Sequence, residues 1–179
     1  QTSAARADYA INVGDDRAYD NRCLGLSPQN YDSIPTGFPP STDTFSGISF
    51  CGTAVQLRQV ADGLSNTLAL GEKRVHISSY EGQVLWEADD WSLYCGFQDD
   101  VVRSTFYNGK TATHTPRPDS VPESSLNTII SRELFGSAHA AGCIVSMCDG
   151  SVLLLDYEVD PEVFRQMGHR ADGGAPRPK

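Results

Sequence analysis

Near the C-terminus, two apolar runs at residues 142–147 and 151–157 are joined by the three residues Cys148-Asp149-Gly150. An Asp-Gly pair between two strand-like runs is a strong signal for a β-hairpin, because a type I′ turn needs positive φ at both central residues. Few windows elsewhere in the chain hold a helical apolar period for long, which also favours a β-rich fold. We therefore predict an antiparallel hairpin with a type I′ turn.

A short helix is predicted directly after the hairpin. Asp160 is a typical N-cap residue, Pro161 suits the first helical position, and Glu162 places an acidic group in the first turn. Gly168 is a candidate for the end of the helix. Three apolar side chains fall on one face of this helix: Val163, Phe164 and Met167.

The other strand candidates are short and separated by turn-rich segments. Residues 7–14 fit a short strand or an ordered coil, and residues 68–70 fit a buried strand. Residues 55–60 alternate apolar and polar side chains, as a half-buried strand does. Residues 84–86 and 92–97 are weaker strand candidates. Residues 33–47 and 108–125 contain prolines and are predicted to be exposed loops.

Composition supports a folded protein. The chain has 179 residues, of which 39% are hydrophobic and 21% are charged, so that it can bury a core and disorder is not expected. No internal repeat or linker divides it. We predict one domain over residues 1–179, of a β-rich α+β class with an antiparallel sheet, a C-terminal hairpin and a short C-terminal helix.

The formal net charge of −9 restricts the partners of this protein. It disfavours nucleic-acid binding through a basic patch, and an anionic membrane surface would repel the chain. The charge either serves solubility or attracts cations such as calcium. The sequence contains neither a signal peptide nor a transmembrane run.

The five cysteines show no CxxC pair of the kind found in zinc sites. In an oxidising compartment one or two disulfides are expected, and Cys23 with Cys51 is the first candidate pair because both lie in the loop-rich first third. Cys143 and Cys148 lie on one candidate strand at odd separation. Such residues point to opposite faces, so we do not expect these two to bond to each other.

Two sequence blocks carry a resemblance to a known family. His139 and Asp149 are separated by nine residues, within the context F-G-S-x-H followed by an apolar strand and D-G-S-V. This is similar to the H-x9-DG signature of a family of planctomycete proteins, called the DUF1559 family or prepilin-type processing-associated H-x9-DG proteins. The second block resembles the family's D-G-x-S-N-T and G-E segments: Asp62-Gly63-Leu64-Ser65-Asn66-Thr67 followed by Leu70-Gly71-Glu72.

Two weaker matches extend the resemblance over most of the chain. Tyr9-Ala10 and Asn12 resemble a Y-A-x-N segment of the family, and residues 170–174 resemble its terminal R-x-G-G with one extra residue. The resemblance implies the globular head of a protein related to type IV pilins and type II secretion pseudopilins. In such proteins a prepilin signal and a long apolar helix precede the head, and this chain lacks that helix.

The resemblance therefore leads us to expect a structural, non-enzymatic role at the cell surface or in the extracellular or periplasmic space. Expected partners are other pilin-like subunits or cell-envelope components. Contact with a membrane is expected only through the absent N-terminal helix. Two alternatives stay open, a solute- or carbohydrate-binding module and a metal-dependent enzyme that uses His139 and acidic neighbours.

His139 and Glu72 are the first candidates for a site. Glu72 ends an apolar strand after Gly71, so it can approach the histidine. His139 is either a buried structural residue that orders the start of a strand, or a metal ligand or general base. The other histidines, His76, His114 and His169, are predicted to be surface residues.

The oxygen-bearing side chains of Asp62, Asn66 and Asp149 suit calcium if loops bring them together. Each also has a local explanation, because Asp and Asn side chains cap turns by accepting backbone hydrogen bonds. We leave both interpretations open at this point.

The segment Ser65-Asn66-Thr67 follows the Asp62-Gly63 turn. Its hydroxyl and amide groups either cap that turn or recognise a sugar or other solute. The second interpretation relies on aromatic side chains nearby in the sequence: Trp86, Trp91 and Tyr94.

Overall fold

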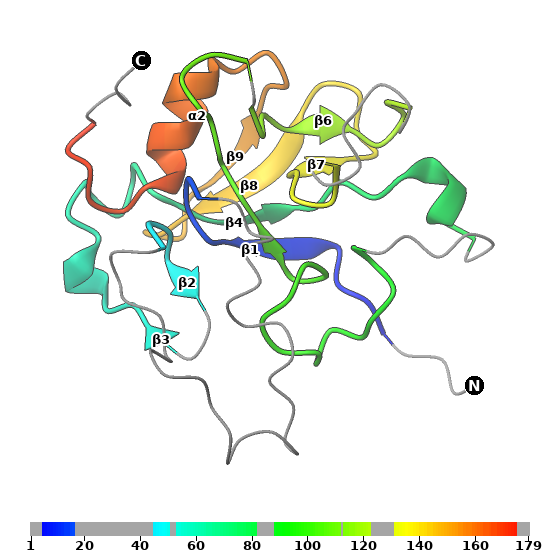
Figure 1. Ribbon diagram of the computed structural model, residues 1–179, viewed down its shortest axis with the longest axis horizontal. Helices are drawn as coiled ribbons and strands as arrows, with labels where there is room; N and C mark the ends of the chain where they lie inside the picture. The colour runs from blue at the N-terminus through cyan, green and yellow to red at the C-terminus, as the bar shows by residue number, and fades with distance from the viewer. Residues whose placement is uncertain are drawn as a thin grey trace.

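The computed structural model describes residues 5–16, 45–50, 53–81, 88–111, 113–122 and 131–174 (Figure 1). Within these ranges the elements are, in chain order, β1 (Tyr9–Asn12), β2 (Ser49–Phe50), β3 (Thr53–Ala54), the 3₁₀ helix η2 (Leu57–Gln59), β4 (Leu68–Glu72), the 3₁₀ helix η3 (Ile77–Ser79), β5 (Val102–Arg103), β6 (Arg117–Pro118), β7 (Gly136–Ser137), β8 (Cys143–Met147), β9 (Val152–Leu155) and α2 (Pro161–Gly168).

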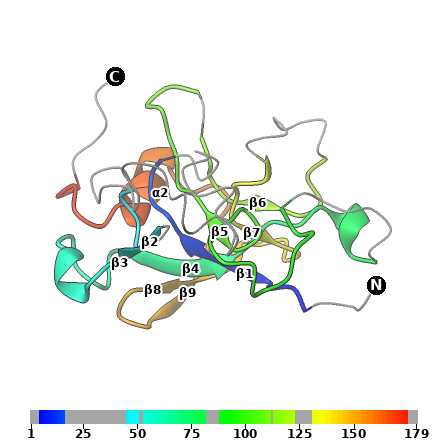
Figure 2. The ribbon, with the colours of Figure 1, turned by 60° about the horizontal axis from the view of Figure 1, so that its bottom comes forward.

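The central element is a five-stranded sheet in the order β5-β1-β4-β8-β9. The helix α2 packs on one face of this sheet (Figures 1 and 2). The predicted β-rich α+β class is confirmed, but the sheet is mixed and not wholly antiparallel, because Ile11 of β1 pairs in parallel with Val102 of β5. Parallel pairing requires a long connection, and the chain between these two strands, which includes β4, provides one.

The C-terminal hairpin forms as predicted, with Ile144 opposite Leu154, but its turn is of another type. Gly150 has φ of 84°, and no non-glycine residue among those described has positive φ. The Gly150 amide donates to Met147 O at 3.0 Å. This is the three-residue loop in which a type I turn ends in a left-handed glycine, because Cys148 makes the connection one residue too long for type I′.

The helix α2 has the predicted start and cap, and it ends at Gly168, the first of the candidate glycines. Asp160 Oδ1 accepts hydrogen bonds from the amides of Glu162 at 2.9 Å and Val163 at 3.0 Å. The buried face is centred on Phe164, however, and Val163 is 49% exposed. Val163 is about 100° around the helix from Phe164, which places it at the margin of the buried face.

Two apolar clusters fill the interior. The first joins the sheet to α2 and includes an edge-to-face contact between Phe135 and Phe164, whose centroids are 6.2 Å apart. The second packs loops against β1 and β5 and includes the stacked rings of Phe45 and Phe50, 5.6 Å apart. Gly71 in β4 is the glycine of the G-E segment, and it packs closely against β8. A Cβ added at this position would lie 2.8 Å from Val145 Cγ1, so a larger residue does not fit.

Two of the predicted strands are wrong. Residues 55–60 contain η2, in which the Gln56 amide donates to Gln59 Oε1 at 2.7 Å, and Leu57 is 66% exposed. Residues 92–97 form turns. Among the described residues neither segment pairs with a strand, and alternation without a pairing partner does not make a strand.

The predicted loops fall partly outside the described residues. Residues 84–86 and most of 33–47 lie outside them, although Phe45 of the second segment is buried. The segment 108–125 is less exposed than predicted, because His114 and Thr115 are buried in the part that the structure describes. Buried hydrogen-bond and ion-pair partners hold this loop inward, as shown below.

A single buried amide connects β1, β4 and α2. The Asn12 side chain is fully buried, and its Nδ2 donates to Leu68 O at 2.9 Å and to Gly168 O at 2.8 Å. Its Oδ1 accepts a hydrogen bond from the Gly14 amide at 2.8 Å. An asparagine is required because only an amide side chain offers two donors and an acceptor in this geometry.

We predict that Asn12→Ala lowers the free energy of unfolding by about 2–4 kcal/mol, because three buried backbone groups lose their partners. Asn66→Ala is the control, since the exposed Asn66 makes one side-chain bond, to Asp62 O at 2.9 Å. Urea denaturation should show a change of less than about 1 kcal/mol for this variant. Equal changes for the two variants would contradict the role assigned to Asn12.

Candidate functional site

The structure brings Glu72 and His139 together at the end of β4. His139 Nε2 lies 3.6 Å from Glu72 Oε1. The His139 side chain is 65% exposed and that of Glu72 is 16% exposed, so the expectation of a buried histidine is wrong. The other oxygen of Glu72 accepts a hydrogen bond from the Ile144 amide at 2.7 Å. The carboxylate thus connects β4 to β8, while the imidazole faces solvent.

The F-G-S-x-H segment builds a tight loop between β7 and β8. Ser137 Oγ accepts from the His139 amide at 3.0 Å and donates to Gly142 O at 3.0 Å. The Tyr157 hydroxyl donates to His139 O at 2.8 Å. Gly136 packs against the neighbouring strand, where an added Cβ would lie 2.0 Å from Arg117 O. These contacts account for the glycine and the serine by packing and hydrogen bonding.

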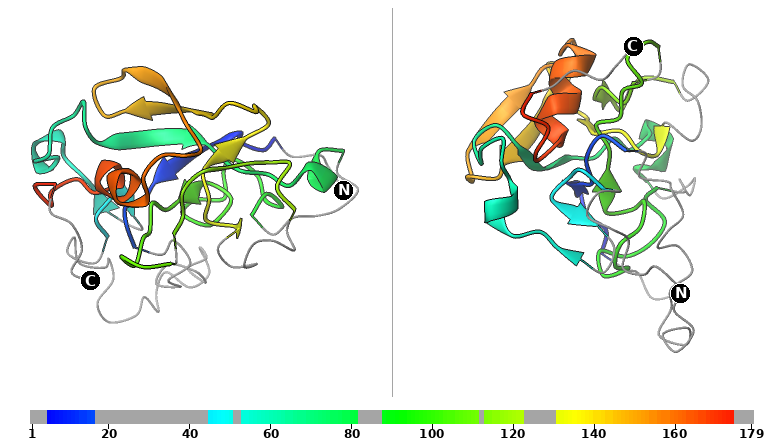
Figure 3. Two further views of the ribbon diagram at one scale, coloured as in Figure 1. Left: turned by 90° about the horizontal axis from the view of Figure 1, so that it is seen from above. Right: turned by 60° about the vertical axis from the view of Figure 1, so that its left-hand side comes forward.

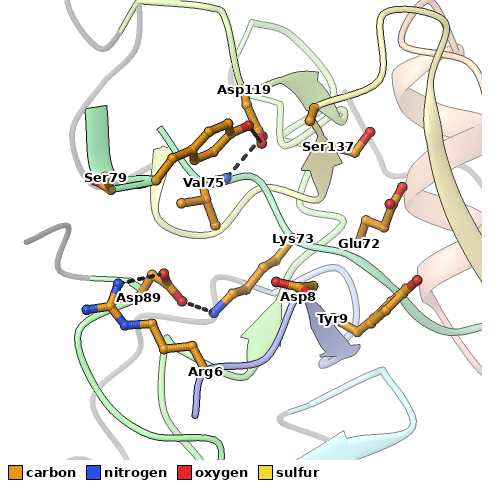
Figure 4. A pocket seen from close by; sticks show the side chains of 12 residues that line it. Arg6, Asp8, Tyr9, Glu72, Lys73, Val75, Ser79, Asp89, Asp119 and Ser137 are labelled. Atoms are coloured by element: carbon orange, nitrogen blue, oxygen red, sulfur yellow. Dashed lines mark hydrogen bonds and ion pairs between the residues drawn. The ribbon is translucent and has the colours of Figure 1, made fainter. Parts of the chain in front are cut away.

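A cavity of about 460 Å³ opens beside Glu72 (Figure 4). Its walls come from the start of β1, the end of β4, the η3 segment and the loop after β7. Six of its lining residues are Asp8, Tyr9, Glu72, Tyr80, Asp119 and Ser137. The cavity therefore lies where both family blocks meet, although neither block by itself forms it.

One wall of the cavity is a buried ion pair. Lys73 Nζ lies 2.6 Å from Asp89 Oδ1, and Arg6 reaches the other oxygen of Asp89 at 3.2 Å. Lys73 Nζ also donates to Asp100 O at 2.9 Å. Burial and the nearby charge of Arg103 lower the pKa of Lys73, while Asp89 opposes this shift. Both cations are therefore committed to Asp89.

The opposite wall is held by Asp119. Its carboxylate accepts hydrogen bonds from the Tyr80 hydroxyl and from the Val75 amide, the latter at 3.1 Å. Burial raises the pKa of Asp119, and burial together with the hydrogen bond to Asp119 raises the pKa of Tyr80. The Tyr80 phenol is thereby fixed as a donor, and its ring, in a residue that is 53% exposed, stands at the mouth of the cavity.

The Asp62 turn holds the C-terminal segment. Asp62 Oδ2 accepts from the Asp172 amide at 2.8 Å, and Oδ1 accepts from the Gly173 amide at 2.9 Å. The Asp62 amide in turn donates to Arg170 O at 3.2 Å. The D-G block and the terminal R-x-G-G-like block are thus two halves of one contact.

Two of the proposed calcium ligands, Asn66 and Asp149, make hydrogen bonds within their own turns. Asn66 directs its Nδ2 toward Asp62 O, and Asp149 Oδ1 accepts from the amide and the hydroxyl of Ser151 at 2.8 and 2.6 Å. The two hydrogen bonds from Ser151 lower the pKa of Asp149. These bonds favour the turn-capping interpretation over the calcium site.

A different group of possible ligand atoms lies nearby. Asp62, His169 and Asp172 each place one such atom within 4.8 Å of the others. Both carboxylates, however, already accept internal hydrogen bonds, and Asp172 Oδ2 receives one from Arg165 at 2.7 Å. The group is explained as the anchor of the C-terminal segment.

The segment Ser65-Asn66-Thr67 also has a structural role. Thr67 is fully buried, and its hydroxyl donates to Gly63 O at 3.1 Å. The backbone of the block receives the hairpin tip, because the Cys148 amide donates to Thr67 O at 2.8 Å. Ser65 is exposed and lines a second cavity of about 600 Å³.

The aromatic residues proposed for solute binding do not form a described pocket. Trp91 is 61% exposed and Tyr94 is 87% exposed, and neither lines the cavity beside Glu72. Trp86 lies outside the described residues.

Both cysteines of the candidate disulfide, Cys23 and Cys51, lie outside the described residues. Among the described residues, Cys95, Cys143 and Cys148 are free thiols. Burial, followed by the nearby charge of Glu72, raises the pKa of Cys143 to about 12.

Sequence reasoning missed several buried ionisable side chains, of which His114 and Arg165 are examples. His114, predicted at the surface, is fully buried and bonds through Nε2 to the carboxylate of Glu133. Arg165 lies in α2 with a side chain that is 2% exposed and contacts Asp15 at 2.7 Å. These partners are far apart along the chain, so no local pattern reveals them.

The chain matches the model of one protein family. A family described as "Protein of unknown function (DUF1559)" matches residues 31–162. The chain belongs to the DUF1559 family. No curated protein and no solved structure matches it. Among the residues that the structure describes, no helix of this DUF1559 protein is both long enough and apolar enough to cross a membrane.

We predict that Glu72→Ala lowers the free energy of unfolding by about 1–3 kcal/mol, because the Ile144 amide loses its acceptor. His139→Ala should change it by less than about 1 kcal/mol, since an exposed ion pair contributes little. Urea denaturation of the two variants provides the comparison. A larger loss for His139→Ala would show that the imidazole carries the contact.

We also predict that Asp62→Ala speeds hydrogen exchange at the amides of Asp172 and Gly173, which donate to its carboxylate. The control is Asp156→Ala, because Asp156 accepts the Glu158 amide at 2.8 Å in a separate loop. Amide exchange followed by NMR should show acceleration at the C-terminal segment in the first variant alone. Unchanged exchange there would refute the anchoring role.

Proposed function

We propose that this DUF1559 protein is a structural component of the cell surface, the globular head of a processed pilin-like or pseudopilin-like protein. In this role it packs against other copies of itself within an extracellular or periplasmic assembly. The observation that carries the proposal is an exposed face of apolar and hydroxyl side chains on β4, β8 and β9, which Glu72 borders at the end of β4 and which ends at an open strand edge.

The face lies on the side of the sheet away from α2. Val152 is 66% exposed, Leu154 is 53% exposed and Leu70 is 41% exposed. Directly paired residues of neighbouring strands point to the same face, which makes these side chains contiguous. The pairs on this face are Ile144 with Leu154, Ser146 with Val152, and Leu70 with Ser146.

The edge of the sheet adds a second element. β9 is the last strand in the sheet order, and no other strand among the described residues pairs with its outer side. In Figure 3 the β8–β9 hairpin lies at the margin of the molecule. An unpaired edge offers backbone donors and acceptors to another chain, and monomeric proteins usually protect such edges with charge. The strand sequence here, VLLL, has none.

The charge of the chain favours this face for self-association. Copies with a formal net charge of −9 repel one another over most of their surfaces. The side chains at positions 70, 144, 146, 152 and 154 are all uncharged, so they form a region where two copies can meet without that penalty. Contiguous exposed apolar side chains often mark interaction sites.

The resemblance to prepilin-type proteins supports the same assignment. It rests on the H-x9-DG block and the D-G-x-S-N-T block, and the structure shows what both contribute to the fold. In pilin-like proteins the head packs against neighbouring heads while an apolar helix holds the subunits together. A surface component of this kind needs an interaction face on the head, which the β4–β8–β9 face provides.

We predict that the protein self-associates with increasing concentration and that Val152→Lys reduces this, because the substitution places a charge on the shared face. Leu57→Lys is the matched control, since Leu57 is also 66% exposed but lies on η2. Sedimentation velocity should give a concentration-dependent mass for the unchanged protein and the control. A monomer of 19.4 kDa at every concentration would contradict the proposed interface.

The pilin-like assignment has its own test. We expect the complete coding sequence to place a prepilin cleavage site and a long apolar helix before Gln1. A reading frame that lacks both would overturn the pilin-like assignment. The proposed interface would then be judged by the self-association experiment alone.

A further inference from the structure

The outer edge of β9 presents the backbone groups of two residues. The Met147 amide donates to Ser151 O at 2.9 Å, so the Ser151 carbonyl faces β8. In an antiparallel pair the N–H and C=O groups of one residue point to the same side, and those of the next residue point to the other side. The backbone groups of Leu153 therefore face β8, whereas those of Val152 and Leu154 face outward.

The other end of β9 gives the same assignment. A Cβ added at Gly142 would lie 2.3 Å from Leu155 O, so this carbonyl faces the chain at the start of β8. Alternation then directs residues 151, 153 and 155 inward and residues 152 and 154 outward. Among the residues that the structure describes, β8 is the only strand that pairs with β9. The edge thus offers two backbone donors and two backbone acceptors.

The spacing of these groups is self-complementary. When the β9 strand of a second copy lies antiparallel with Leu153 opposite Leu153, Val152 of each copy lies opposite Leu154 of the other. Each of these two pairs exchanges two hydrogen bonds, so four bonds form about a two-fold axis. An alignment centred on Val152 or on Leu154 makes one such pair within β9, and therefore two bonds.

This alignment also buries apolar side chains on both faces of the joined sheet. Val152 and Leu154 lie on the exposed β4–β8–β9 face, and directly opposite side chains contact each other. Leu153 pairs with the buried Val145, so its side chain lies on the α2 side, where it is 36% exposed. The two Leu153 side chains meet there. The contact is thus apolar above and below the new strand pair.

The sequence of β9 favours a second copy over a strand from another protein. Its four residues, VLLL, carry no charge with which to select a partner of opposite charge. Specificity then comes from shape and alignment, which the strand already provides for itself. A contact of one strand pair is small, and small interfaces are weak. Pairing therefore requires the high local concentration that an assembly supplies.

We propose that two copies of this protein join through their β9 edges, antiparallel and centred on Leu153, so that their sheets form one continuous sheet. This inference rests on the proposed self-association and specifies the contact through which it occurs. It brings the two β4–β8–β9 faces side by side as one surface.

Disulfide trapping tests the alignment. Opposite residues at a position that makes no hydrogen bonds across the new strand pair have Cα atoms about 4.5 Å apart, within the range of a disulfide. Oxidation of Leu153→Cys at rising protein concentration should give a dimer with a bond between the two introduced cysteines, mapped by mass spectrometry. Val152→Cys is the control, because diagonal neighbours lie about 7–8 Å apart. It should give about tenfold less bond between its introduced cysteines.

A backbone test separates strand pairing from simple apolar contact. Leu154→Pro removes the outward N–H, and an edge strand tolerates proline where its N–H faces solvent. Sedimentation velocity should show several-fold weaker association for Leu154→Pro than for Leu154→Ala, which loses the side chain but keeps the N–H. Circular dichroism of each variant checks that the fold is intact.

The outcomes distinguish this contact from self-association in general. A protein that self-associates without the bond between cysteines at 153, or whose proline and alanine variants associate equally, would overturn the β9 pairing and leave the β4–β8–β9 face in place. Trapping at 152 in preference to 153 would refute the alignment. A monomer at every concentration would refute both the pairing and the proposed interface.

Discussion

The buried side-chain amide of Asn12 is the interaction on which the arrangement of this fold depends. It satisfies Leu68 O in β4 and Gly168 O at the end of α2 from a single position in β1. An apolar residue could fill the same space but would leave these carbonyls without donors. The sheet, the helix and therefore the walls of the cavity beside Glu72 are oriented by this contact.

Because several strands are short, buried charged side chains also supply hydrogen bonds to the backbone. β5 has only two residues, and Arg103 within it donates to Leu134 O at 2.9 Å and to Val102 O at 2.7 Å. Burial lowers the pKa of Arg103 to about 10, and the neighbouring carboxylates Asp99 and Asp100 oppose this shift. The Arg103 guanidinium thus satisfies one carbonyl of β5 and one of the loop at Leu134. Such contacts also bring loops into the interior that a turn-rich sequence suggests are exposed.

The predictions that held were those that depend on near neighbours in the chain. The hairpin at Gly150 and the cap at Asp160 each involve hydrogen bonds across a few residues. The type I′ turn is the local prediction that failed, and the other failures concern burial and pairing. His114 is buried against Glu133, nineteen residues away, and His139 is exposed in the loop between β7 and β8. A sequence pattern contains no information about which distant carboxylate fills the space beside a histidine.

By itself, the sequence determined the family, the β-rich class, the hairpin and the capped helix, because turn geometry and helix capping are local and residue-specific. The tertiary structure alone decided that the Asp62 turn anchors the C-terminal segment and that Glu72, which lies beside His139, lines a cavity. Each of these features depends on contacts between segments that are distant in the sequence. Packing determines such contacts, whereas the local conformational preference of each segment does not.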